Sequence, residues 1–192
     1  MGRAQTFDTD EVVRAARAVF WERGYEDASL PSLERATSLS RSSIYHAFGS
    51  KRGLFDAALA SYLAEIIRPR LQPLNSPDVA PEAITDYFSG LRAALAQPDS
   101  LQSHNGCLLL NAAGAPISHE EAVSHAIAGY RDELKNSLGR GVAAHRPGID
   151  DGARLQLATV LSSLVVAAMT LSRIDNAQAV ATLDTALALL QD

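Results

Sequence analysis

Hydrophobic residues recur at three- and four-residue intervals along most of this 192-residue chain, which is the spacing of one face of an α-helix. In the first such stretch, Val12, Ala16, Val19 and Phe20 share a face. No segment alternates hydrophobic and polar residues with the period of two that marks a half-buried strand. We therefore predict an all-α fold of about nine helices, over residues 9–24, 30–36, 41–48, 51–67, 81–96, 107–113, 119 to about 138 or beyond, 150 or 151 to about 172, and 176–190.

Capping residues and prolines set the expected ends of these helices. Serine hydroxyls can accept from the free N–H groups of a first turn, and three early helices follow a serine, namely Ser29, Ser40 and Ser50. The helix from Lys51 is expected to stop at Arg68, because the residue before Pro69 avoids the helical region. Ser118 is expected to cap the helix that begins at His119.

The segment from Ser29 to Phe55 contains two short helices joined by a tight turn, followed by the start of a third. It carries basic residues but no acidic one between Glu34 and Asp56. The exposed side of helix 41–48 presents hydrogen-bond donors, and its apolar residues can point inward. This pattern is typical of a DNA-reading helix-turn-helix. An ordinary helical hairpin with a solvated basic face is the alternative reading of the same spacing.

The helix-turn-helix interpretation assigns roles to eight side chains. Those predicted to face base edges are Arg41, Ser42, Ser43 and His46. Those predicted to contact phosphates are Thr37, Ser40, Tyr45 and Lys51.

Residues from about Phe7 to Phe55 resemble the N-terminal DNA-binding domain of the TetR family of bacterial transcriptional repressors. The matching segments are FDTDEVVRAARAVFWERGYEDASL, the A-T-x-L-S turn at residues 36–40, and SSIYHAFGSKRGLF. One departure is Ser38, at the turn position where the family usually has glycine. The resemblance implies a DNA-binding domain over residues 1–50 and a ligand-sensing and dimerisation domain over residues 51–192.

The same resemblance implies a homodimer that binds a palindromic double-stranded DNA operator. A small-molecule or thiol-reactive inducer would then release it, with helix 51–67 connecting the sensing and reading domains. A helical DNA-binding protein that responds to no ligand is the alternative.

Charge and composition fit this reading. The net charge is −5, yet residues 1–55 carry eight basic and seven acidic side chains, against nine and fifteen in the rest. This asymmetry places any polyanion contact at the N-terminal end. No Ser/His/Asp order, paired carboxylates, phosphate loop or nucleotide fingerprint has supporting context, so we predict neither an enzyme nor a cofactor.

The single cysteine, Cys107, excludes an internal disulfide and fits a reducing cytoplasm, and no secretory leader precedes the first helix. Residues 155–172 are the most apolar stretch, but six hydroxyl or amide side chains make them a poor membrane span. We therefore expect a cytoplasmic protein with no membrane contact.

The last two predicted helices are apolar nearly all the way round, so each must be covered on more than one side. Two such helices from each of two chains would form a four-helix interface about a two-fold axis. A core within one chain is the alternative. The predicted interface residues are Leu157, Leu161, Leu164, Val165, Ala168, Leu183 and Leu187.

Cys107 follows Gly106 at the start of a predicted helix, where the helix dipole lowers the pKa of a thiol. His104 would add to this effect if it lay close. The segment HNGCLLLNAA is also similar to a TetR branch that includes regulators of electrophile, acrylate and copper responses, which implies a reactive sensor cysteine. The alternative is a packing residue, since free cysteines are often buried.

An apolar pocket with a few polar groups is expected among the middle helices, as is usual for a small-molecule site. Its predicted lining residues are Tyr87, Phe88, Leu91, Cys107, Leu110, Asn111, Tyr130 and Leu134. Metal sensing by His104, Cys107, His119 and His125 is a separate possibility. The spacing of these four matches no closed zinc site, so we predict no metal.

Overall fold

The computed structural model describes residues 7–97 and 100–191, and these residues form helices and turns without a β-strand. The N-terminal unit consists of α1 (Thr9–Asp27), α2 (Leu30–Thr37) and α3 (Arg41–Phe48). Side-chain oxygens of Asp8, Ser29 and Ser40 cap the three helices. The all-α prediction is therefore confirmed, together with the serine caps of α2 and α3.

The turn between α2 and α3 depends on two adjacent residues. Ser38 has a φ of 57° and a ψ of 19°, the left-handed conformation, and is the only non-glycine residue with positive φ in the described chain. The Thr37 hydroxyl donates to the Leu33 carbonyl at 2.7 Å and accepts from the Leu39 amide at 3.3 Å. These two bonds hold a turn that serine would otherwise disfavour.

The prediction that the next helix stops at Arg68 is wrong. The connector runs as α4 (Lys51–Tyr62), a π-helical turn η1 (Leu63–Ile67), α5 (Arg68–Leu71) and a 3₁₀ turn η2 (Gln72–Asn75). The Arg68 amide donates to the Leu63 carbonyl, five residues back. This wider turn accommodates Pro69, whose missing N–H and bulky ring disrupt ordinary α-helical bonding. The helical backbone therefore continues through Pro69 instead of ending there.

The remaining elements are α6 (Ala83–Ala96), α7 (Leu101–Asn105), α8 (Leu108–Ala113), η3 (Pro116–His119), α9 (Glu121–His145), α10 (Asp151–Leu171) and α11 (Asn176–Gln191). The nine α-helices of six residues or more in the described chain correspond to the nine predicted ones. Helix α7 was not predicted, although the Ser100 hydroxyl caps it at 3.0 Å. The predicted cap Ser118 is wrong, because it lies in η3 and Glu120 directly precedes α9.

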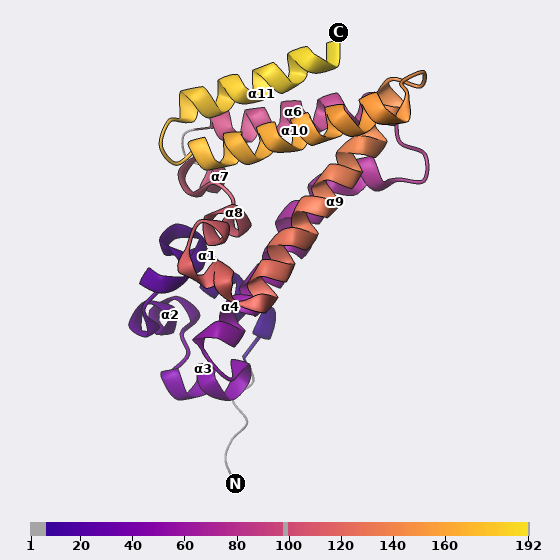
Figure 1. Ribbon diagram of the computed structural model, residues 1–192. Coiled ribbons are helices and arrows are strands. Elements are labelled where there is room, and N and C mark those ends of the chain that lie inside the picture. Colours follow the sequence, from indigo (N-terminus) through magenta and orange to yellow (C-terminus); the bar gives the residue numbers. More distant parts are fainter. Residues whose placement is uncertain (1–6, 98–99, 192) are drawn as a thin grey trace.

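Two groups of helices meet at an angle in the molecule (Figure 1). Helices α6, α10 and α11 lie side by side at the C-terminal end, while α1–α3 form the opposite end. The long helix α9 extends from the N-terminal unit to α10, alongside the connector. One continuous hydrophobic core joins the two ends, from Val12 to Leu190. A change in the packing of the middle helices can therefore reach α1–α3 through side-chain contacts.

Helix α10 is the one helix in residues 7–97 and 100–191 that is long and apolar enough to cross a membrane. Its neighbours α9 and α11 pack against it, and buried Leu161 and Val165 belong to the common core. Packing within the chain therefore accounts for only part of the apolar surface of α10, because 28% of its most apolar stretch is buried and Leu155 and Val160 stay exposed. The prediction of a buried helix is met only in part.

Candidate nucleic-acid interface and inner cavity

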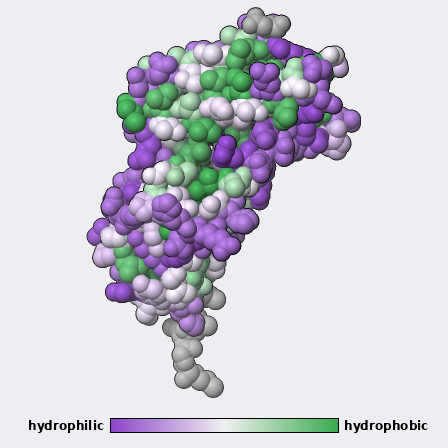
Figure 2. Space-filling view, in the orientation of Figure 1, coloured by the Kyte–Doolittle hydropathy of each residue, from purple (hydrophilic) through white to green (hydrophobic). Residues whose placement is uncertain are grey.

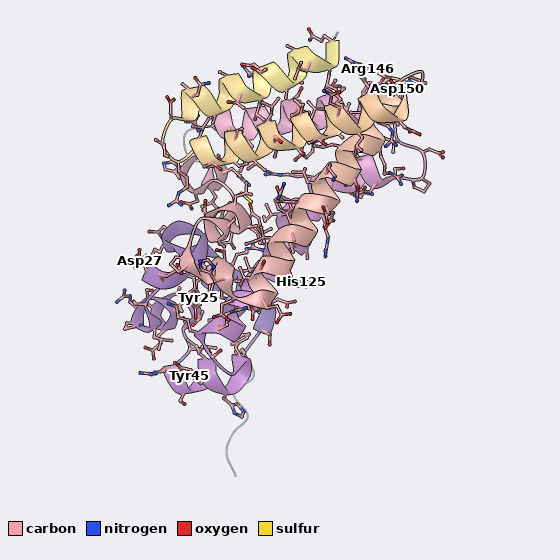
Figure 3. All side chains as sticks on the ribbon, in the orientation of Figure 1. Tyr25, Asp27, Tyr45, His125, Arg146 and Asp150 are labelled. Carbon is pink, nitrogen blue, oxygen red and sulfur yellow. The ribbon has the colours of Figure 1, made fainter. Side chains whose placement is uncertain are left out.

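Helix α3 lies at the end of the molecule, with Tyr45 on its outer part (Figure 3). Ile44 is fully buried and anchors the helix to the core, whereas Arg41, Ser42 and His46 are exposed. We call the outward-facing side chains of α3 and its cap the recognition surface; they are Ser40, Arg41, Ser42, Ser43, Tyr45 and His46. The predicted donors therefore share one surface.

The first turn of α3 is fixed by side chains on both helices of the pair. The Ser40 hydroxyl accepts from the Ser43 amide at 3.2 Å. The Arg41 amide donates to a Glu34 carboxylate oxygen at 2.6 Å, which ties α3 to α2. The Arg41 guanidinium lies 5.4 Å from the centre of the Tyr45 ring. This cation–π contact orients the guanidinium along the exposed side of α3.

Two predicted phosphate contacts lie away from the recognition surface. Thr37 is buried, and its hydroxyl is used in the turn described above. Lys51 is half-buried at the start of α4, where its Nζ lies 3.3 Å from the Glu26 carbonyl oxygen and 4.5 Å from the centre of the Tyr25 ring. Burial lowers the pKa of Lys51, and nearby Glu26 opposes that shift. The structure thus places Thr37 in the core and Lys51 against the end of α1.

Cys107 lines a small space that we call the inner cavity, with a volume of about 20 Å³. The thiol is 1% exposed, and three tyrosines, Tyr62, Tyr87 and Tyr130, line the cavity with it. Burial raises the pKa of the Cys107 thiol, although the Leu110 and Leu109 amides and the hydroxyls of Tyr62 and Tyr130 lower it in part. The pKa of the thiol is therefore raised overall, opposite to the prediction, although the amides at the start of α8 act in the predicted direction.

The histidine expected to assist Cys107 has other partners. His104 is exposed, and its Nδ1 lies 3.3 Å from both the Ser100 carbonyl oxygen and the Ser103 hydroxyl. Across the described residues, no group of three or more His, Cys, Asp or Glu side chains is placed to hold a metal ion.

The predicted ligand residues fall into several places. Tyr87, Leu91, Cys107 and Tyr130 line the inner cavity together. Phe88 is core, and its ring packs edge-on to Tyr87 at 5.3 Å. The other three line two separate surface depressions, Leu110 and Asn111 in one and Leu134 in the other.

Six further residues of the inner cavity were not among the predicted ligand contacts: Tyr62, Ile67, Arg70, Leu71, Val165 and Met169. Tyr62 and Ile67 precede Pro69, where the sequence predicts that the helix ends, and Arg70 lies directly after it. A helix predicted to continue through Pro69 would have placed Arg70 and Leu71 on the same connector as Tyr62 and Ile67.

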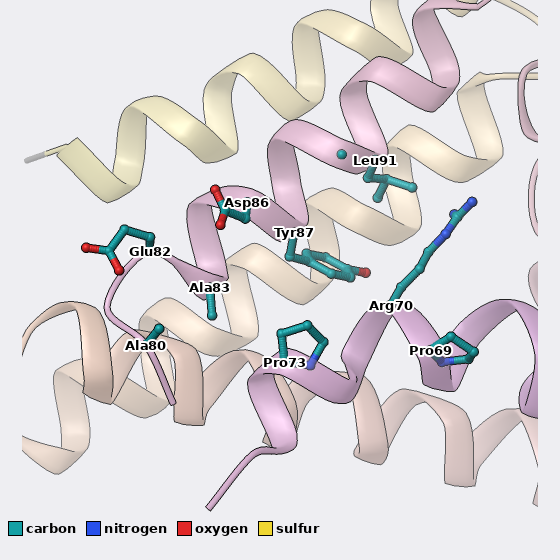
Figure 4. A pocket seen from close by; sticks show the side chains of 10 residues that line it. Pro69, Arg70, Pro73, Ala80, Glu82, Ala83, Asp86, Tyr87 and Leu91 are labelled. Carbon is teal, nitrogen blue, oxygen red and sulfur yellow. The ribbon is translucent and has the colours of Figure 1, made fainter. Parts of the chain in front are cut away.

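A larger depression, which we call the outer cleft, adjoins the inner cavity and has a volume of about 430 Å³ (Figure 4). Arg70, Tyr87 and Leu91 line both spaces. The other residues of the outer cleft are Pro69, Pro73, Ala80, Glu82, Ala83, Asp86 and Gly90. Arg70, Tyr87 and Leu91 therefore border both spaces, and their side chains can change conformation without unfolding a helix.

A direct contact joins the inner cavity to the N-terminal unit. The buried Trp21 indole of α1 donates from Nε1 to the Gly106 carbonyl oxygen at 3.1 Å. The Trp21 ring also packs edge-on against Tyr62, with 5.0 Å between ring centres. Gly106 precedes Cys107, and Tyr62 lines the cavity. One side chain of the N-terminal unit thus contacts both the residue before Cys107 and a tyrosine that lines the cavity.

The C-terminal helices use much of their apolar surface within the chain. Of the seven predicted interface residues, Leu161, Val165, Ala168 and Leu183 are buried in the chain's own core. They cannot also contact a second copy without a rearrangement. Leu157, Leu164 and Leu187 are half-buried. Helix α10 additionally exposes Leu155 and Val160, and Figure 2 shows hydrophobic residues gathered over the part of the molecule that contains α10 and α11.

Comparisons with known proteins agree on one family. Residues 12–58 match the family profile described as bacterial regulatory proteins, tetR family. The uncharacterized HTH-type transcriptional regulator YezE of Bacillus subtilis is 32% identical over 142 residues, which cover 74% of this chain and 72% of that protein. The HTH-type transcriptional repressor ComR of Escherichia coli is 32% identical over 111 residues, covering 57% and 51% of the two chains.

Among solved structures, a cysteine mutant of the TetR family transcriptional regulator CifR in complex with 26-base-pair double-stranded operator DNA has a TM-score of 0.77 and 32% identity. The alignment covers 97% of this chain and 98% of that one.

Proposed function

The chain belongs to the TetR family of transcriptional regulators, which are not enzymes, and from that premise we propose that it is a ligand-responsive repressor acting as a homodimer. Residues 1–50 bind a palindromic operator, and residues 51–192 sense an inducer and form the dimer. The relative ComR is a repressor, and the similar CifR structure contains operator DNA, which supports repression and DNA binding in the proposal.

The recognition surface supplies the DNA contacts in this proposal. Arg41, Ser42, Ser43 and His46 face base edges in the major groove, because they project from the exposed side of α3. Ser40 and Tyr45 flank that side and contact phosphates. Lys51 reaches the DNA phosphates only by leaving its contact with Tyr25. It therefore adds to affinity through its charge and does not fix the position of the protein on DNA. Thr37 makes no DNA contact in this proposal, since its hydroxyl is occupied inside the turn.

Dimerisation uses the outer faces of α10 and α11. Leu155 is 55% exposed and Val160 40%, and half-buried Leu157 and Leu164 lie on the same helix. Covering these side chains removes apolar surface from water on both copies at once. The arrangement holds two copies of α3 at a fixed separation, which a palindromic operator requires.

The observation that carries the ligand response is the pair of contacts made by Trp21. Any molecule that displaces Tyr62 or the backbone at Gly106 must disturb a residue of α1. Since α1 packs against α2 and α4, the disturbance changes how α3 is presented. The inducer acts to the extent that it binds the DNA-free arrangement more tightly than the DNA-bound one.

The test begins with recovery of genomic DNA fragments by the purified protein, followed by fluorescence anisotropy with the fragment obtained. Failure to recover any specific fragment would contradict the repressor assignment. Wild type and Cys107→Ser are then compared, each with and without N-ethylmaleimide. Release of wild type alone assigns the response to the thiol, whereas equal behaviour of both proteins assigns it to a reversible ligand.

The Trp21 coupling is tested separately with Trp21→Phe, which keeps a smaller aromatic ring and removes the N–H donor. We expect this variant to bind the operator while losing part of its response to an inducer that works on wild type. An unchanged response would show that the Gly106 contact transmits nothing.

A further inference from the structure

The two adjoining spaces differ in what they can hold. A volume of about 20 Å³ is enough for about one water molecule, so the inner cavity as it stands excludes an organic ligand. The outer cleft, at about 430 Å³, is in the range of small-molecule sites. Its lining is mostly apolar, with Pro69, Pro73 and Leu91 among the walls. A ligand would therefore bind first in the outer cleft.

Arg70 is the cationic residue of that cleft, and it differs from neighbouring arginines in having no carboxylate partner. Arg68, on the same short helix, pairs with Glu133 at 3.2 Å. Arg14 and Arg17 pair with Glu65 at 3.1 and 3.0 Å. Within the described residues, Arg70 makes no ion pair or side-chain hydrogen bond, although it is half-buried. A partly desolvated guanidinium without a counter-ion is stabilised by any anion that reaches it.

The surroundings of Arg70 define the shape of such an anion. Tyr87 contributes a second donor beside Leu91, on the side of the cleft where Arg70 projects (Figure 4). Glu82 and Asp86 line the opposite part of the cleft. These two carboxylates would repel a second negative group at that end of a ligand.

From these observations we propose that the outer cleft binds an amphipathic organic monoanion. Its carboxylate or sulfonate lies on the Arg70 guanidinium, and its apolar body lies against Pro69, Pro73, Tyr87 and Leu91. This inference names the ligand class of the proposed repressor and depends on that function only for its effect on DNA. Binding displaces Arg70 and Tyr87, which also line the inner cavity, and so opens the route to Cys107.

Calorimetric titration of the full-length protein with three compounds of matched size tests the proposal. They are 3-phenylpropionate, 3-phenylpropanol and 3-phenylpropylamine. We expect the acid to bind at one site per chain at least about tenfold more tightly than the alcohol, because a charge-assisted hydrogen bond replaces a neutral one. The amine should bind most weakly. Equal binding of acid and alcohol, or no binding of the acid at millimolar concentration, would overturn the proposal.

Two arginine variants form a matched pair. Arg70→Gln should reduce the affinity for the acid about tenfold, to that for the alcohol, and Arg70→Lys should restore part of it. Arg68→Gln, two residues away on the same helix, should leave the preference for the acid unchanged. If Arg68→Gln loses as much as Arg70→Gln, the effect is general electrostatics and the assigned site is wrong.

Tryptophan emission locates the bound acid, since Trp21 is the only tryptophan and packs against Tyr62 of the inner cavity. The emission of wild type should change on titration with the acid, and Arg70→Gln should show the same change only at about tenfold higher concentration. If the emission of Arg70→Gln changes at the same acid concentration as that of wild type, the acid binds at another site. Operator anisotropy then separates the two proposals: binding of the acid without release of DNA would contradict the ligand response while leaving the anion site intact.

Discussion

Replacing Gly106 with alanine tests the junction between the N-terminal unit and the inner cavity. Gly106 has a φ of 63° and a ψ of −130°, a conformation that side chains rarely adopt. A Cβ atom at this position would lie 2.5 Å from the Met169 carbonyl oxygen and 3.3 Å from the Ser172 hydroxyl. The oxygen at 2.5 Å belongs to the backbone of α10, so it cannot rotate away.

Two costs add in this variant. A strained backbone conformation costs about 1–3 kcal/mol, and overpacking a fixed neighbour costs about 1–3 kcal/mol. We therefore expect Gly106→Ala to lower the free energy of unfolding by about 2–6 kcal/mol, a large share of the total stability of a small protein.

Two other glycines separate the contributions. Gly24 has a φ of 79° but nothing within 4 Å of the added Cβ, so Gly24→Ala should show the strain alone. Gly129 lies in α9 with open space around it, so Gly129→Ala should be neutral or stabilise by up to about 1 kcal/mol. Urea unfolding followed by circular dichroism measures all three. If Gly106→Ala loses no more free energy of unfolding than Gly24→Ala, the clash with α10 does not exist and the junction is looser than the structure indicates.

Three further predictions concern the proposed regulator. Lys51→Gln should weaken binding to specific and random DNA alike and lower the slope of log affinity against log salt by about one. Arg41→Ala should reduce discrimination against a mutated operator by about 1–3 kcal/mol, and equal loss on random DNA would refute base reading. Leu155→Glu should yield monomers in sedimentation at micromolar concentration without lowering the melting temperature, because Leu155 is 55% exposed in the single chain.

Sequence periodicity predicted the helices well because their apolar faces are wide and regular. The three serine caps were predictable for a local reason, since each hydroxyl accepts from an amide three positions further on. The connector was mispredicted at Pro69 because a π-helical turn depends on a bond between Leu63 and Arg68 that no residue type signals. A proline in the sequence thus shows where helical hydrogen bonding is disrupted, while packing decides whether the helix ends there.

The recognition surface and the inner cavity differ in how far sequence could predict them. The exposed positions of α3 follow from one buried residue, Ile44, and the helical period. The cavity is assembled from residues as far apart as Tyr62 and Met169, and helix faces alone do not specify which of them meet. The same limit explains the interface prediction, because Leu161 and Leu183 look identical to interface residues until α6 and α9 are seen to cover them.

The thiol of Cys107 is subject to two effects of opposite sign. The start of α8 favours the thiolate by an amount of about 0.3–1 kcal/mol, and this helix is only six residues long. Burial favours the neutral thiol by more, so the pKa of Cys107 is raised. The thiol should therefore react with N-ethylmaleimide more slowly in the folded protein than in urea, with a rate that increases with pH.

Reaction of Cys107 also needs the inner cavity to open, since about 20 Å³ does not admit a maleimide. In the proposed opening, Arg70 and Tyr87 move, because they line both the inner cavity and the outer cleft. A ligand that favours the open arrangement must raise the population from which labelling occurs. We therefore expect 3-phenylpropionate, at a concentration equal to its wild-type Kd, to accelerate labelling of Cys107 in wild type and in Arg68→Gln, and to accelerate it much less in Arg70→Gln. Labelling that is equally fast with and without the acid would show that the cleft and the thiol are energetically independent.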